Sequence, residues 1–207
     1  MEYFSIWDFF LVPAYILLAW VISARIAKRR REKLPHYRFY HWGLLYKIGG
    51  ALALCAIYLF YYGGGDITGY FRSALVLRNL LFEDPGTYLS ILANHLTPEN
   101  FSAFTNETGY PIYYRDPNSF TVVRFTSVLM LFTTGSFLQV SILTAIVTYS
   151  GVWRLYLMFV EMYPKNDTLL AIAALFIPSV AFWGSGVLKD SYTMAAAGWF
   201  IFAFYKI

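Results

Sequence analysis

Charged residues are scarce in this sequence. Only 14% of its 207 residues are Asp, Glu, Lys or Arg, whereas 58% are hydrophobic. A soluble domain of this length carries charge on about a quarter of its residues. The charges here are also clustered, and apolar runs of about twenty residues separate the clusters, which is the length that a helix needs to cross a bilayer. The composition excludes a soluble enzyme and predicts an integral membrane protein.

Cysteine is nearly absent as well. Cys55 is the only one, and it lies inside an apolar run. A single thiol cannot form an internal disulfide, and it argues against a metal site built on sulfur.

The motifs of common soluble active sites are also missing. Gly63-Gly64-Gly65 is not followed by the lysine and hydroxyl residue of a phosphate-binding loop. Ser185-Gly186 lacks the strand–turn–helix context of a nucleophile elbow. His95 is best interpreted as an ordinary histidine at a helix end. The net charge of +4 does not indicate nucleic-acid binding, because most of the excess lies in one short stretch beside a predicted span.

What the sequence does contain is a series of apolar runs that predicts an all-α, polytopic transmembrane bundle. We predict about five spans, at residues 4–23, 44–62, 137–162, 168–183 and 192–205.

The distribution of basic residues predicts the orientation of the first span. No basic residue precedes it, whereas a dense basic run follows it: Arg25, Lys28, Arg29, Arg30, Arg31, Lys33 and Arg38. A cleaved signal peptide has the opposite arrangement. We therefore predict an uncleaved anchor with its N-terminus outside and a basic cytoplasmic loop, which would also attract anionic lipid headgroups.

A long connection of mixed polarity, residues 63–119, follows the second span. Its segments 73–82 and 88–96 are typical of short amphipathic helices in the plane of the interface, and 106–118 is typical of a turn-rich surface loop. Asp66 lies where the span ends and this connection begins. It is either a residue of a solvated turn after a helix C-cap, or a carboxylate held at the membrane surface as a base or metal ligand.

The side on which the later loops lie depends on residues 120–134, an apolar run that is short for a span and contains Arg124. If this run stays on the outer side, Lys165 and Lys206 are cytoplasmic and Asp190 is outside. If it spans, every later side is reversed. Counting loop lysines favours the first arrangement.

The first arrangement brings Asp66, Lys189 and Asp190 to one side of the membrane. Two carboxylates can hold a divalent cation or accept a proton, and a lysine can neutralise phosphate charge. The alternative is an interfacial Lys–Asp pair with no further role.

The chain resembles the integral-membrane GT-C glycosyltransferases between about residues 44 and 190. The resemblance rests on Asp66 after an early span, on the long outer connection, and on the run from Ala171 to Pro178 that leads to Phe182-Trp183-Gly184-Ser185-Gly186-Val187-Leu188-Lys189-Asp190. Enzymes of that superfamily transfer sugars from polyprenyl-phosphate carriers on the extracytoplasmic face.

The resemblance implies specific roles for several residues. Asp66 would be the base or a metal ligand and Asp190 a second acidic ligand, with Mg²⁺ or Mn²⁺ as the implied cation. The residues implied in substrate binding are Lys189, Arg72, Tyr70 and Arg115. The implied location is the bacterial inner membrane, with residues 1–43 as an anchor and basic loop and 44–207 as an incomplete GT-C-like domain.

Members of the superfamily usually have eight or more spans, which exceeds the five predicted here. We therefore expect either that the chain continues in a longer protein or that partner membrane proteins complete the bundle. Two other functions stay open. One is a polysaccharide polymerase or an exporter of lipid-linked glycans, and the other is a non-catalytic membrane subunit of an envelope secretion or transport complex.

Overall fold

The computed structural model describes residues 3–207, and every regular element in that part of the chain is a helix. The predicted all-α class is confirmed. In chain order the elements are α1 (Asp8–Arg31), η1 (Pro35–Phe39), α2 (Tyr40–Ala56), η2 (Ile57–Tyr61), α3 (Asp66–Glu83), α4 (Pro85–Leu92), α5 (Pro98–Phe101), α6 (Pro117–Met130), α7 (Phe137–Met162), η3 (Pro164–Asn166), α8 (Asp167–Ala171), η4 (Ile172–Phe176), α9 (Pro178–Trp183) and α10 (Lys189–Tyr205).

Within residues 3–207, three helical segments are long and apolar enough to cross a membrane: Asp8–Arg31, Pro35–Tyr61 and Phe137–Met162. They support a membrane protein. The bounds of α7 agree with the predicted span, whereas α1 begins later than predicted and extends into the basic run, so Lys28 to Arg31 form its last turn instead of a loop. The spans predicted at 168–183 and 192–205 are not among these three segments, and the count of five spans stays a prediction.

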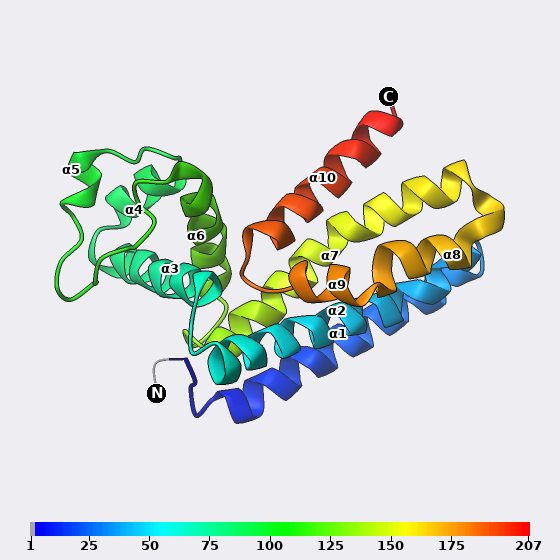
Figure 1. The fold of residues 1–207 in the computed structure, drawn as a ribbon, viewed down its shortest axis with the longest axis horizontal. Coiled ribbons are helices and arrows are strands. Elements are labelled where there is room, and N and C mark those ends of the chain that lie inside the picture. The colour runs from blue at the N-terminus through cyan, green and yellow to red at the C-terminus, as the bar shows by residue number, and fades with distance from the viewer. Residues whose placement is uncertain (1–2) are drawn as a thin grey trace.

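The three long helices lie side by side (Figure 1). Near the end of α1, Ser23 contacts His41 at the start of α2, so these two helices are antiparallel. At the start of α1, the Asp8 carboxylate accepts a hydrogen bond of 2.7 Å from Gln139 at the start of α7. Helices α1 and α7 therefore run in the same direction, opposite to α2.

Helix α10 runs parallel to α7 and packs closely against it. The two backbones meet where both helices have glycine. A Cβ atom added to Gly198 would lie 2.2 Å from the Gly151 carbonyl oxygen, and one added to Gly151 would lie 2.1 Å from that of Ala195. At the far ends of the pair, Lys206 forms an ion pair with Glu161. Small residues of this kind allow membrane helices to approach closely.

The run predicted as a span at 168–183 is not one continuous helix. The chain instead forms α8 and η4, leaves the helical conformation at Ile177 (ψ 123°), and starts again as α9 at Pro178. Proline lacks an N–H donor and disfavours the helical conformation at the preceding residue, which explains the interruption.

Helices α3 to α6 form a unit, here called the head, beside one end of the bundle (Figure 1). Its core packs α3 against α6 and continues through Phe71 and Phe120 to Phe137 at the start of α7. The run predicted at 120–134 is mostly α6, within the head. The interfacial helix predicted at 73–82 is longer than expected, because α3 already begins at Asp66.

Three glycines make that earlier start possible. Gly63, Gly64 and Gly65 have φ angles of 68°, 138° and 140°, a region that residues with a side chain rarely adopt. These angles end η2 and let the chain enter α3 directly, so Asp66 opens a helix instead of lying in a turn after one.

Candidate functional site

Asp66 and Tyr113 form one half of the candidate site. Asp66 is exposed at the first position of α3, and the Tyr113 hydroxyl donates a hydrogen bond of 3.2 Å to its Oδ1. The ring of Tyr113 lies on that of Tyr70, with centroids 4.6 Å apart. Tyr70 is only 3% exposed, so its buried ring packs against the inner side of the Tyr113 ring.

Burial raises the pKa of Tyr113 to about 12, and the negative charge of Asp66 and its hydrogen bond act in the same direction. The phenol therefore stays protonated at physiological pH and continues to donate to Asp66.

Lys189 and Asp190 form the other half, in the first turn of α10. The Lys189 ammonium lies 3.7 Å from Oδ2 of Asp116, the residue that caps the start of α6. The hydroxyl and backbone N–H of Ser119 hold the pKa of Asp116 below its usual range, and Lys189 contributes less. Lys189 is therefore tied to the head by an exposed ion pair, which is weak in water.

The two halves converge on one rim. Tyr58, near the start of η2, interacts electrostatically with both Asp66 and Asp190. The short loop from Tyr113 to Asp116 contacts Asp66 through its first residue and Lys189 through its last. We use the name rim for these six residues: Tyr58, Asp66, Tyr113, Asp116, Lys189 and Asp190.

The remaining two predicted binding residues lie on the head. The Arg72 guanidinium lies over the ring of Tyr3, 5.3 Å from its centroid. Arg115 is exposed next to Asp116 and lines a separate hollow of about 290 Å³ with Thr97 and Tyr114.

For the divalent cation implied by the resemblance, the rim offers the carboxylates of Asp66 and Asp190. Within residues 3–207, no group of three or more His, Cys, Asp or Glu side chains is arranged to hold a metal ion. Two carboxylates fit the mode in which Mg²⁺ keeps several waters and takes its other ligands from substrate phosphate.

Sequence reasoning missed Lys47. It lies in the middle of the segment Pro35–Tyr61, is 5% exposed, and donates a hydrogen bond to the Gly184 carbonyl at the end of α9. Its signal in the sequence is a single charge inside an apolar run, and an ionisable residue at such a depth is a candidate functional residue. The bond anchors the turn that leads from α9 to Lys189 and Asp190.

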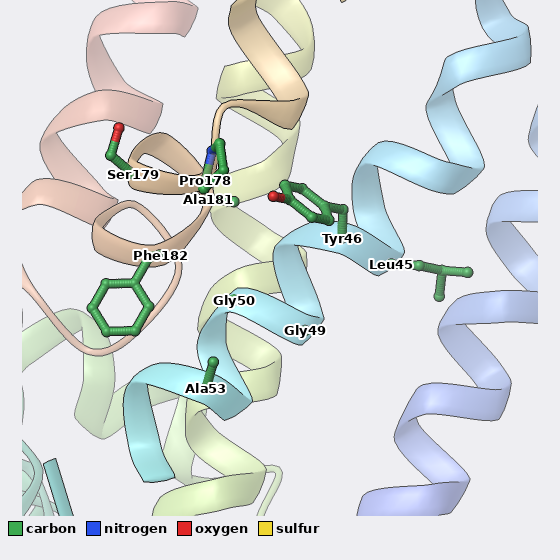
Figure 2. Close-up of a pocket in the computed structure, with 9 residues that line it drawn as sticks. All are labelled: Leu45, Tyr46, Gly49, Gly50, Ala53, Pro178, Ser179, Ala181 and Phe182. Carbon is green, nitrogen blue, oxygen red and sulfur yellow. The ribbon is translucent and has the colours of Figure 1, made fainter. Parts of the chain in front are cut away.

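Beside this anchor, an apolar groove of about 600 Å³ is lined by residues of α2 and α9, two helices that contact each other. Figure 2 shows Gly49, Gly50 and Ala53 on α2, and Pro178 and Phe182 on α9.

No protein-family model, curated protein or solved structure matches this chain.

Proposed function

We propose that the protein is a membrane glycosyltransferase-like enzyme that transfers a sugar from a polyprenyl-phosphate carrier at the rim, on the extracytoplasmic face. The observation that carries the proposal is that the loop from Tyr113 to Asp116 contacts Asp66 at one end and Lys189, the neighbour of Asp190, at the other. Two carboxylates, a lysine and a phenol at the end of membrane helices match the groups that such a transfer needs.

The proposed reaction is a displacement at the anomeric carbon of the sugar. The bond from this carbon to the carrier phosphate breaks and the phosphate leaves with the carrier, while a new bond forms to the acceptor hydroxyl oxygen. Asp66 accepts the proton of that hydroxyl, and Tyr113 holds the carboxylate in position by its hydrogen bond of 3.2 Å.

Three positively charged residues would balance the negative charge that develops on the leaving phosphate. Lys189 lies on the rim, and Arg72 and Arg115 lie on the head. A divalent cation held by Asp66 and Asp190 would supply further positive charge at the phosphate.

The apolar groove between α2 and α9 would hold part of the carrier chain. It is lined by apolar and small residues (Figure 2), and it lies against the turn that Lys47 connects to the rim. In this proposal α6 stays on the outer side with the head, so that α7 runs inward and α10 starts outside. This agrees with the antiparallel packing of α2 and α7.

The test is sugar transfer from a labelled polyprenyl-phosphate donor, measured for Asp66→Asn and Asp190→Asn. Loss of a catalytic base typically lowers the rate by about 10²–10⁴-fold, and we expect that range for Asp66→Asn. Glu107→Gln is the matched control, since Glu107 is an exposed head carboxylate outside the rim, and it should transfer at the wild-type rate.

Unchanged transfer in both rim variants would contradict the catalytic role. A stoichiometric complex with other membrane proteins that contains no lipid phosphate would favour a non-catalytic subunit instead.

A further inference from the structure

A second candidate site lies at the end of α1, near the basic run. There, a hollow of about 530 Å³ separates the last turns of α1 from the first turn of α2. Its lining combines small, basic and aromatic residues: Ala24, Ala27, Lys28, Arg31, Glu32, Arg38, His41 and Trp42.

The charge in this hollow is predominantly positive, with three cations and one carboxylate. Within residues 3–207, neither Lys28 nor Arg31 forms an ion pair. Arg38 has its own partner, because its guanidinium lies 3.1 Å from a carboxylate oxygen of Asp167. Lys28 and Arg31 are thus the two cations available to a ligand, and ammonium and guanidinium groups both bind phosphate oxygens well.

His41 adds a fixed polar atom to this lining. It is 8% exposed and its Nδ1 lies 2.8 Å from the Ser23 hydroxyl oxygen. The Ser23 hydroxyl also lies 2.5 Å from the Ala19 carbonyl oxygen. The hydrogen bond between Nδ1 and Ser23 fixes the orientation of the His41 ring. Its Nε2, which has no hydrogen-bond partner in the described chain, remains for the hollow.

The surroundings of the hollow indicate a ligand that is part lipid. Both flanking segments, Asp8–Arg31 and Pro35–Tyr61, are candidate membrane spans. Trp42 borders the hollow with 57% of its surface exposed, and Trp20 lies 6.1 Å from it, ring centroid to ring centroid. Tryptophan pairs of this kind are typical of the level of lipid headgroups.

We propose that this hollow is a specific binding site for the phosphate headgroup of an anionic phospholipid, independent of the rim. Lys28 and Arg31 contact the phosphate, and Ala24, Ala27 and Trp42 contact the glycerol and upper acyl chains. This differs from the general attraction between basic segments and anionic membranes, which depends on the number of charges and not on their position.

The test exploits that difference. Native mass spectrometry of the full chain in neutral detergent measures the occupancy by phosphatidylglycerol, with phosphatidylcholine of the same chain length as the reference lipid. The site variant is K28Q with R31Q. The matched control is R29Q with K33Q, which removes the same charge from the same basic run at two positions that do not line the hollow.

We expect the site variant to lower the affinity for phosphatidylglycerol by about tenfold or more, and the control to change it less than about threefold. Equal losses in the two variants would overturn the proposal and leave only general attraction. If inorganic phosphate displaced the lipid at equal concentration, the ligand would be a soluble phosphate, which would also overturn it. The thermal unfolding midpoint of each variant verifies that the fold is intact.

Discussion

Single residues on the rim and beside it have partners that are distant in the sequence. Tyr113 lies 47 residues from Asp66, and Lys47 lies 137 residues from Gly184. The sequence predicted Asp66, Lys189 and Asp190 as candidates, because carboxylates and a lysine beside apolar runs are conspicuous. It did not indicate Tyr113 or Asp116 as their partners, because the folding of the head brings Tyr113 to Asp66 and the packing of the head beside α10 brings Asp116 to Lys189.

Lys47 provides the first prediction at this scale. Lys47→Glu places a carboxylate against the Gly184 carbonyl oxygen in a buried position, and we expect it to destabilise the fold by about 3–5 kcal/mol, as removal of a buried charged partner does. Lys47→Met keeps the length of the side chain and loses one hydrogen bond, at a cost of about 1–3 kcal/mol. Thermal unfolding in detergent measures both.

Lys165→Glu is the matched control for this series, because Lys165 is exposed in the turn after α7. It should leave the unfolding midpoint nearly unchanged. If Lys47→Glu were equally harmless, the bond between Lys47 and Gly184 would contribute nothing to the fold.

The pH dependence of stability provides the second prediction, at Asp116. Ser119 and, to a smaller extent, Lys189 lower the pKa of this carboxyl. A lowered pKa in the folded state stabilises the protein fully above the unfolded value of about 3.9, and this contribution is lost as the pH falls through the folded pKa. Asn is also a good helix N-cap, so Asp116→Asn removes the charge and keeps the cap.

We therefore expect Asp116→Asn to unfold at a lower temperature than the wild type near neutral pH, and the two midpoints to converge as the pH falls below about 3.9. Thermal unfolding followed by circular dichroism across this pH range measures the difference. A difference that stayed constant with pH would show that the charge of Asp116 has no part in stability.

Among the helices, the sequence predicted α7 best, because its apolar run is long and contains no proline. The helix predicted at 168–183 failed because of Pro178. Hydropathy counts this residue as part of an apolar run, whereas its backbone chemistry ends the helix before it. The start of α3 at Asp66 was also missed, since Gly63 to Gly65 were interpreted as the beginning of a loop and their positive φ angles were not predicted.

The contact between α7 and α10 leads to the third prediction, at the scale of elements. Gly198→Leu places a branched side chain where even a Cβ atom would lie 2.2 Å from the Gly151 carbonyl oxygen. The two helices must then separate, and we expect a loss of about 3 kcal/mol or more, because overpacking of this size costs as much. Gly49→Leu is the control for the unfolding temperature alone, since a Cβ there meets nothing within 4 Å but Gly49 lines the proposed carrier groove.

The measurement is again thermal unfolding, together with the rate of sugar transfer. Since α10 carries Lys189 and Asp190 at its first turn, separation from α7 should also reduce transfer. If Gly198→Leu unfolded at the wild-type temperature, α10 would not pack against α7 as described.

The whole molecule consists of a helical bundle with the head and the rim at one end and the basic end of α1 at the other (Figure 1). Composition predicted an all-α membrane protein, because few other folds suit long apolar runs separated by clustered charges. Hydropathy could not decide whether α6 spans the membrane or stays with the head, because α6 is nearly as apolar as a membrane span. Its packing on α3 in the head decides its place in the fold.

The central claim is that the rim and the basic end of the bundle lie on opposite faces of the membrane. Its most direct test is the labelling of single introduced cysteines by a membrane-impermeant thiol reagent in intact cells. The buried native Cys55 should stay unlabelled. We predict that Glu107→Cys in the head is labelled from outside, and that Lys33→Cys and Lys165→Cys are labelled only after the membrane is permeabilised. Labelling of Glu107→Cys and Lys165→Cys from the same side would contradict the account, because the rim and the basic end of the bundle would then not lie on opposite faces of the membrane.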